Sequence, residues 1–194
     1  MAGQRRVPAD GFDEVFAVNH LAPFLLTNLV LGKLAAAGSG RVITVTSGAH
    51  AAARLDLDDL QLEHGWQSWR AYANSKLANI LFTRELARRL EGSAVTANCA
   101  HPGLVRTRFG RETRLPMRAA VTLARPFMLS PRRGARTIVY LATSSEVAGA
   151  TGGYYARSQL REPSPAARDD AVARRLWQLS EELTGLTPGR PTGT

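Results

Sequence analysis

The chain has 194 residues, of which 44% are hydrophobic and 21% are charged, and its formal net charge is +9. This size and composition predict a single globular domain with a proper core, and they exclude a disordered chain, a collagen and a repeat array. Cys99 is the only cysteine, so an internal disulfide and a paired-cysteine motif are excluded. It lies in an apolar run, where we expect a buried and inert thiol, and a reducing compartment is the default for such a protein.

The sequence indicates no membrane anchor. We identify no stretch close to the roughly 18 to 20 apolar residues that a membrane-spanning helix needs. The pair Arg5-Arg6 is not followed by the apolar core of a signal peptide. We therefore expect no transmembrane segment and a cytoplasmic location.

The first half of the chain predicts a helix and then a strand. Residues 11–37 have the apolar stripe of a long helix, with Asp10 as the expected N-cap and a glycine-rich stop at 38–40. Residues 41–47 form a short β-branched run between turn residues, which is typical of a buried parallel strand. That strand places Ser47 at its carboxyl end, and in open α/β sheets ligands bind just outside those ends.

The rest of the chain alternates in the same way. The expected elements are a helix at 69–90, a strand at 95–101, a helix at 134–143, a strand at 152–155 and an amphipathic helix at 165–183. Pro102-Gly103 ends the second strand, and residues 185–194 are expected to be a disordered tail. Helices that alternate with strands predict an α/β fold with a parallel sheet.

Tyr72 and Lys76 are one helical turn apart, and on a helix positions i and i+4 share a face. A phenol has a reference pKa of about 10, so a general base made from it needs a fixed positive charge close by. The chain has only two lysines, Lys33 and Lys76, among 25 basic residues, which indicates that arginine would not serve at this spacing. The spacing alone also fits a half-buried tyrosine beside a solvated lysine.

Positive charge gathers between Leu104 and Arg136. This segment has nine arginines and one acid, Glu112, a local balance of +8. Three interpretations stay open: a solvated face, an electrostatic site for an anionic partner, and a basic lid near a phosphate-bearing cofactor. Apolar residues among the arginines leave attraction to a membrane surface open as well. Nucleic-acid binding is disfavoured, because the segment lacks interleaved aromatics, zinc-ligand spacing and a helix-turn-helix pattern.

Seven motifs follow one another along the chain: Asp10-Gly-Phe-Asp, Val18-Asn-His-Leu21, Val42-Ile-Thr-Val-Thr-Ser47, Tyr72-Ala-Asn-Ser-Lys-Leu-Ala-Asn79, Glu85-Leu-Ala-Arg-Arg-Leu90, His101-Pro-Gly103 and Gly134-Ala-Arg-Thr137. In this order they resemble the second half of a short-chain dehydrogenase/reductase, with the retinol-dehydrogenase-like branch closest. The resemblance covers about Asp10 to Ala156. It implies a three-layer, doubly wound parallel sheet, a Rossmann-like α/β fold, of which only the C-terminal half is present, as the family's strands 5 to 7 with their flanking helices.

The resemblance also implies the roles of four residues. Tyr72 would be the catalytic acid/base, and Ser47 would be the hydroxyl that orients and polarises the substrate oxygen. Asn19 would support a proton-relay water, and Lys76 would lower the pKa of the tyrosine and hydrogen-bond the nicotinamide ribose. Without the resemblance, Ser47 equally fits the cap of a turn, and Asn19 equally fits an amide bonded to backbone.

The same resemblance implies a nicotinamide site. Tyr72 and Lys76 would border the cofactor together with residues that follow the second strand: Pro102, Gly103, Val105 and Thr107. Arg106 and Arg108 would lie near its phosphates. The cofactor is expected to be NADP or NAD. We expect core or surface positions, and no metal site, for three histidines without ligand spacing: His20, His50 and His101.

One part of the family pattern is missing. Family members begin with a strand, a glycine-rich turn and a helix that hold the cofactor pyrophosphate, followed by the residue that selects NAD or NADP. Before Asn19 this chain has no glycine cluster. We therefore expect residues 1–184 to form the C-terminal catalytic part of a single domain. The strand at 41–47 would then have one open edge, which favours aggregation or partner binding.

Two functions follow from these features. The first is an NAD(P)-dependent oxidoreductase that transfers hydride reversibly between the cofactor and a hydrophobic alcohol, aldehyde or ketone, with Tyr72 as acid/base. The alternative is an inactive, truncated remnant that acts, if at all, as an interaction module through the open strand edge or the basic face. The expected partners are a small hydrophobic substrate and a second copy of the chain, because the family commonly forms its dimer contact with helices such as that of Tyr72.

Overall fold

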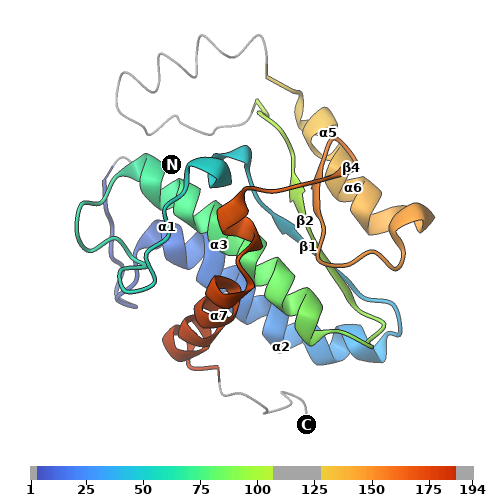
Figure 1. Cartoon of the computed structure of the whole chain (residues 1–194), viewed down its shortest axis with the longest axis horizontal. Coiled ribbons are helices and arrows are strands. Elements are labelled where there is room, and N and C mark those ends of the chain that lie inside the picture. Colours follow the sequence, from blue (N-terminus) through green and yellow to red (C-terminus); the bar gives the residue numbers. More distant parts are fainter. Residues whose placement is uncertain (1–3, 107–127, 187–194) are drawn as a thin grey trace.

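The computed structural model describes residues 4–106 and 128–186. In these ranges a four-stranded sheet lies between two layers of helices (Figure 1). The strands, in the order in which they pair, are β1 (Arg41–Val45), β2 (Thr96–His101), β3 (Tyr154–Ala156) and β4 (Gln159–Arg161). The first three run parallel, as predicted, whereas β4 pairs antiparallel with β3 and was not predicted.

Helices cover both faces of the sheet. The α-helices are α1 (Glu14–Phe16), α2 (Ala22–Ala36), α3 (Ser68–Arg89), α5 (Pro131–Gly134), α6 (Arg136–Thr143) and α7 (Asp170–Thr184). A π-helical turn, η1 (Ala17–Leu21), joins α1 to α2, and the 3-10 turns are η2 (Gly48–Ala52), η4 (Ser145–Val147) and η5 (Pro165–Arg168). Figure 1 shows α2, α3 and α7 on one side of the strands and α5 and α6 on the other. This is the three-layer α/β arrangement that the sequence predicts.

The first helix begins three residues later than expected. Asp13, not Asp10, is its N-cap, because the Asp13 carboxylate accepts hydrogen bonds from the N–H groups of Val15 at 3.1 Å and Phe16 at 3.0 Å. Its second oxygen accepts the indole N–H of Trp66 at 3.0 Å, so the cap also anchors the loop before α3. The predicted helix 11–37 is therefore divided into α1, the π-helical turn and α2.

Helix α2 is apolar but poorly covered. Phe24 is its one buried residue, while Val18 in the preceding turn and Leu26 are 65% and 62% exposed. By length and composition alone, the 23 residues Glu14–Ala36 form a helix that is apolar enough to cross a membrane. This corrects the expectation that no stretch approaches that length. A core helix of a soluble protein passes the same test, yet only 22% of the most apolar window is buried here.

Strand β2 is the centre of the core. Its small side chains alternate between the two faces: Ala97 and Cys99 face α3 and α7, and Ala100 faces the α6 side. Small residues let α3 approach the sheet closely, and its Leu77 and Leu81 are almost fully buried there. Full burial of each such side chain contributes about 1.5–3 kcal/mol. Burial also raises the pKa of the Cys99 thiol to about 12, which makes it unreactive, in accord with the expectation of an inert cysteine.

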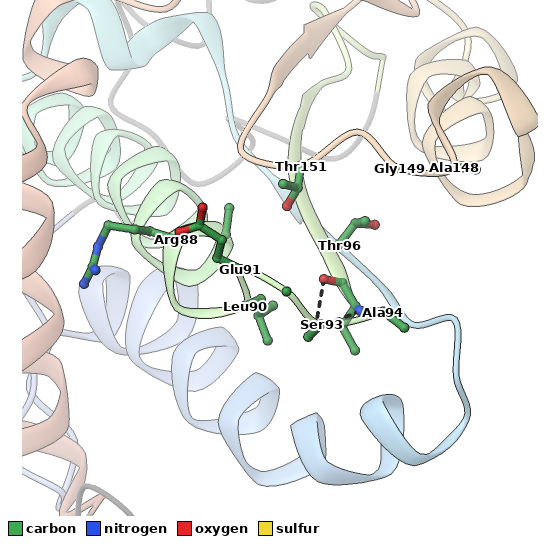
Figure 2. Close-up of a pocket in the computed structure, with 12 residues that line it drawn as sticks. Arg88, Leu90, Glu91, Ser93, Ala94, Thr96, Ala148, Gly149 and Thr151 are labelled. Atoms are coloured by element: carbon green, nitrogen blue, oxygen red, sulfur yellow. Dashed lines mark hydrogen bonds between the residues drawn. The ribbon is translucent and has the colours of Figure 1, made fainter.

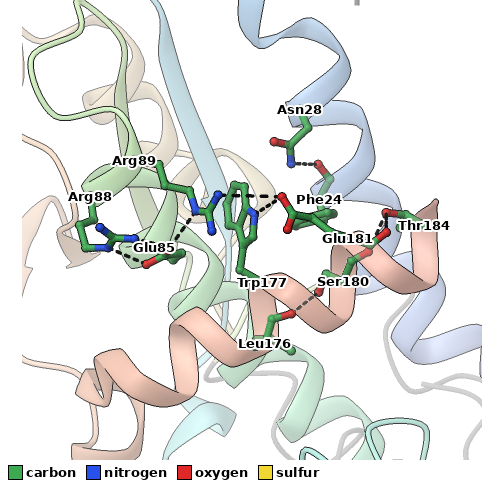
Figure 3. A network of polar contacts seen from close by, with 10 residues as sticks. All are labelled: Phe24, Asn28, Glu85, Arg88, Arg89, Leu176, Trp177, Ser180, Glu181 and Thr184. Atoms are coloured by element: carbon green, nitrogen blue, oxygen red, sulfur yellow. Dashed lines mark hydrogen bonds and ion pairs between the residues drawn. The ribbon is translucent and has the colours of Figure 1, made fainter. Parts of the chain in front are cut away.

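A polar network joins α3 to α7 at the edge of this core (Figure 3). The Glu85 carboxylate accepts hydrogen bonds from Arg88 and Arg89, both at 2.7 Å at the shortest. Arg89 lies over the ring of Trp177, 4.2 Å from its centroid, and Trp177 donates its indole N–H to Glu181 at 2.7 Å. Burial raises the pKa of Glu85, but the two arginines outweigh it, so the pKa is lowered overall and the carboxylate stays charged.

His20 lies deep in the same layer. It is 1% exposed, it contacts the rings of Phe16, Phe24 and Phe82, and its Nε2 lies 2.9 Å from Ser180 Oγ. Burial, only partly opposed by Asn79, lowers the pKa of His20 to about 4. The imidazole is therefore neutral in the folded protein at neutral pH.

The buried histidine predicts a stability loss in mild acid. Between pH about 6.5 and pH about 4 the unfolded chain binds a proton at His20 that the folded chain excludes, so the free energy of unfolding falls as the pH drops through this window. This pKa difference corresponds to about 3 kcal/mol. In urea unfolding from pH 4 to 7, His20→Gln should flatten the pH dependence. An unchanged slope in the variant would show that another group causes it.

Candidate active site

The end of β1 is tied to the middle of α3. The hydroxyl of Thr46, directly after the strand, donates to the carbonyl of Lys76 at 2.8 Å. Asn79 donates its side-chain N–H to the carbonyl of Val45 at 3.2 Å. These bonds fix the carboxyl end of the strand against the face of the helix that carries Tyr72 and Lys76. Ser47, the next residue, is thereby brought to that face.

Ser47, Tyr72 and Lys76 meet at this end of the sheet. Ser47 is hydrogen-bonded to Tyr72, and its Oγ also accepts the N–H of Ala49 at 3.2 Å, so it caps η2 as well. The Lys76 Nζ lies over the Tyr72 ring, 5.6 Å from its centroid, and donates to the Val45 carbonyl at 3.4 Å. A hydroxyl, a phenol and an ammonium therefore share one partly buried site.

The pKa of Tyr72 does not follow the expectation from sequence. Burial raises it, and the hydrogen bond with Ser47 only opposes this effect. Burial also lowers the pKa of Lys76. The Lys76 ammonium lies over the ring, and the pKa of Tyr72 stays raised overall, so a lowered pKa is not the net result in this structure. Ionisation near neutral pH requires further positive charge.

Asn19 reaches the tyrosine helix through a residue that the sequence analysis missed. Its side chain projects from the π-helical turn, and its Nδ2 donates to Ser75 Oγ at 3.0 Å. Ser75 in turn donates to the carbonyl of Tyr72 at 2.8 Å. Among the described residues Asn19 is thus linked to the backbone of α3 through Ser75. The available signal was the serine three residues after the tyrosine, a spacing at which a hydroxyl can bond back along the helix.

The loop after β2 is shaped by two glycines. Gly103 has φ +82°, and a Cβ there would lie 2.9 Å from Leu129 Cδ1. A Cβ on Gly134 would lie only 2.4 Å from Val105 Cγ2. Val105 pairs with Leu129 in an isolated parallel bridge. The loop that begins with Pro102 is therefore closely packed against α5.

Two backbone hydrogen bonds close this loop. The Leu129 N–H donates to the Leu104 carbonyl at 2.8 Å, and the Arg106 N–H donates to the Leu129 carbonyl at 2.9 Å. Leu104 and Arg106 are thereby held against Leu129. The predicted cofactor contact Thr107, with Arg108 and most of the basic segment, lies outside the described residues.

His101 joins two loops beside the site. His101 Nδ1 lies within reach of the N–H groups of Gly48 at 3.2 Å and Gly103 at 3.4 Å, so the loops after β1 and β2 are joined. Burial, then the neighbouring His50 and Arg157, lowers the pKa of His101, which keeps it neutral and able to accept these bonds. No group of three His, Cys, Asp or Glu in 4–106 and 128–186 could hold a metal ion.

Cavities lie at both ends of the sheet. One, of about 630 Å³, is bordered by His101, Gly103 and α6 at the carboxyl ends of β2 and β3. Figure 2 shows a second cavity, of about 590 Å³, bordered by Arg88, Ser93 and Thr96 at the opposite end of the sheet. In open α/β sheets ligands bind at the carboxyl ends of the strands, so only the first adjoins the candidate site.

Comparison with known proteins agrees with this geometry. A family model for short chain dehydrogenase matches residues 2–118, and the chain belongs to this family of oxidoreductases. It is 45% identical to human "Retinol dehydrogenase 14" over 185 residues, which is 91% of this chain and 54% of that protein. It is also 45% identical to "Dehydrogenase/reductase SDR family member 13" of Bos taurus, over 96% of this chain and 50% of the relative. The chain thus spans about half the length of these relatives.

Solved structures share the fold. The crystal structure of an uncharacterized protein from Mycobacterium paratuberculosis superposes with a TM-score of 0.75 at 36% identity, covering 95% of this chain and 63% of that chain. A "4-hydroxyisoleucine dehydrogenase complexed with NADH and succinate" superposes with a TM-score of 0.55 at 22% identity, covering 80% and 63%. The second similarity concerns the fold alone.

The site predicts a tyrosine that ionises above its ordinary range. In ¹³C-tyrosine NMR titrations the Tyr72 resonance, assigned by its loss in Tyr72→Phe, should titrate above pH 10 because burial disfavours the phenolate. Ser47→Ala should move the midpoint higher, because it removes the opposing hydrogen bond. The pKa of Tyr140 is raised as well, by its hydrogen bond to Glu146, and its midpoint should not move in the Ser47 variant. A Tyr72 midpoint below 10 would contradict this description of the site.

Proposed function

We propose that the chain carries the acid/base half of an oxidoreductase that interconverts a hydrophobic alcohol and its aldehyde or ketone with NAD(H) or NADP(H). The observation that carries this proposal is the meeting of Ser47, Tyr72 and Lys76 at the carboxyl end of β1. The names of the relatives, retinol dehydrogenases among them, support an apolar alcohol as the substrate class.

The residues of the site fit the nicotinamide end of such a cofactor. Lys76 has three N–H donors, and among the described residues it makes one hydrogen bond, at 3.4 Å, which leaves donors for ribose hydroxyls. A solved protein of the same fold binds NADH. No glycine-rich turn precedes Asn19 in the sequence, so we assign no residue to the pyrophosphate.

The residues of the chain supply the proton chemistry. The cofactor, when bound, supplies or accepts the hydride. Tyr72 would donate its hydroxyl proton to the oxygen of a carbonyl that is being reduced, and its phenolate would take the proton of an alcohol that is being oxidised. Ser47 would orient the same oxygen. Burial raises the pKa of Tyr72, so the phenol is protonated at neutral pH and available as the acid for carbonyl reduction.

A second candidate function is supported by the open side of the sheet. Among the described residues β1 pairs with β2 alone, and its last residue, Val45, is 42% exposed. The poorly covered helix α2 lies next to this strand. An unpaired edge beside an apolar surface can bind another chain. The chain would then act as an interaction module without turnover.

The proton role of Tyr72 can be tested in a chimaera of human retinol dehydrogenase 14, in which this chain replaces the part that it matches. The chimaera should reduce an apolar aldehyde with NADPH or NADH. Tyr72→Phe should lower kcat by at least about 100-fold, the usual contribution of a general acid. Cofactor affinity should stay nearly unchanged, because a single hydroxyl is removed.

Tyr140→Phe is the matched control. Tyr140 lies on α6, on the other side of the sheet from α3, and its hydroxyl donates to Glu146 at 2.9 Å. Removal of this hydroxyl should therefore leave the rate unchanged. Circular dichroism would establish that all variants fold. A Tyr72→Phe chimaera with a near-normal rate would overturn the assignment of the acid/base.

The two candidate functions differ in what the purified chain binds. Fluorescence titration with NADH and NADPH should give micromolar binding if the chain holds the cofactor itself. If it acts through its open edge, sedimentation should instead show association that depends on concentration. Val45→Lys should then weaken that association, because a charge on an edge strand prevents pairing. Association that this variant leaves unchanged would exclude the β1 edge as the contact.

A further inference from the structure

The cavity at the carboxyl ends of β2 and β3 has an unusual charge. Its volume of about 630 Å³ suits a small organic ligand. Three arginines from three separate elements border it: Arg133 on α5, Arg136 at the start of α6 and Arg157 in the turn between β3 and β4. No aspartate or glutamate is among the residues that border it. The cavity therefore has a local charge of +3 from its own lining.

None of these three arginines forms an ion pair within the described parts of the chain. The ion pairs found within 4–106 and 128–186 involve other arginines, namely Arg6, Arg84, Arg88, Arg89, Arg168 and Arg175. Three like charges around one cavity repel one another, and this repulsion is relieved when an anion binds among them. A guanidinium also pairs with a carboxylate or phosphate through two parallel hydrogen bonds.

The position of Arg157 is fixed by a strained turn. Arg157 and Ser158 have φ of +54° and +58°, a region that residues other than glycine seldom adopt. The turn is held by the Ser158 N–H, which donates to Thr137 Oγ1 at 3.1 Å, and Thr137 is only 4% exposed. Thr137 directly follows Arg136 on α6. The same contact thus holds two of the three arginines at the cavity.

The cavity is also joined to the candidate active site. His101 borders it, and the same imidazole contacts the N–H of Gly48, the residue after Ser47. Apolar side chains complete the lining: Pro102, Leu104, Leu129 and Ala156. A ligand in this cavity can therefore place an apolar body against these residues and an anionic end among the arginines, beside the candidate active site.

We propose that this cavity binds the anionic end of the substrate, an oxyanion such as a carboxylate or a phosphate on an otherwise apolar alcohol or carbonyl compound. The proposal rests on the proposed function and narrows its substrate class. A neutral alcohol of the same length would offer the three exposed guanidinium groups no charged partner. The cofactor phosphates are the other possible source of an oxyanion, and the experiment separates the two.

The test uses the purified 194-residue chain and isothermal titration calorimetry at low salt. The probes are 10-hydroxydecanoate, the neutral 1,10-decanediol of the same length, and NADH. The hydroxy acid should bind at least about tenfold more tightly than the diol, as expected for charge-assisted hydrogen bonds. Arg136→Gln and Arg157→Gln should each remove most of this preference, and added salt should weaken it.

Arg132→Gln is the matched control, because Arg132 lies beside Arg133 on α5 but does not border the cavity. It should bind the hydroxy acid like the unchanged chain. Equal affinities for acid and diol, or an equal loss in the Arg132 variant, would overturn the proposal. Binding of NADH without binding of the hydroxy acid would also overturn it, since the arginines would then serve the cofactor.

Failure of this subsite and failure of the proposed function give different results. Tyr72→Phe should bind the hydroxy acid unchanged, because anion binding needs no proton transfer. A Tyr72→Phe chimaera that keeps its rate refutes the acid/base role and leaves the subsite standing. Loss of the preference for the acid, with Tyr72 still required for turnover, refutes only the subsite.

Discussion

The carbonyl oxygen of Val45 is the point on which the candidate site depends. It accepts hydrogen bonds from both Lys76 and Asn79, two residues of α3 that lie almost one turn apart. These two bonds, together with the hydrogen bond from Thr46 to the Lys76 carbonyl, fix the position of α3 along the end of β1. Among the described residues β1 pairs with β2 alone, and α3 uses the carbonyl group at the end of β1. The Lys76 ammonium is thus positioned by the strand that also leads to Ser47.

The sequence predicted most of the architecture, because the strongest patterns are those of buried elements. The helix expected at 69–90 is observed at Ser68–Arg89, and the strand expected at 95–101 at Thr96–His101. Strand β4 was missed because its turn is built from Arg157 and Ser158, neither of which signals a turn. Ser75 and Asn79 were missed as positioning residues, because their bonds depend on which helix face meets the sheet.

The electrostatics of the site could not be obtained from residue types. A tyrosine and a lysine four residues apart indicate a lowered tyrosine pKa only if the ammonium approaches the hydroxyl, whereas here it lies over the ring. Burial then decides the sign of the pKa change. Likewise, the basic segment read as a solvated face or a site for anions, and only the fold brings Arg133 and Arg136 to one cavity with Arg157. The pKa of Tyr72 and the charge of the cavity both depend on distances between side chains, which the sequence does not give.

The pairing of Val105 with Leu129 has an evolutionary consequence. Backbone hydrogen bonds join Leu129 to Leu104 and to Arg106. The chain therefore has fixed positions at Arg106 and at Leu129. The packing of Gly103 against Leu129 depends on these fixed points and not on the residues between them. Relatives could therefore vary the sequence between the two points and still keep the loop after β2 in the same place.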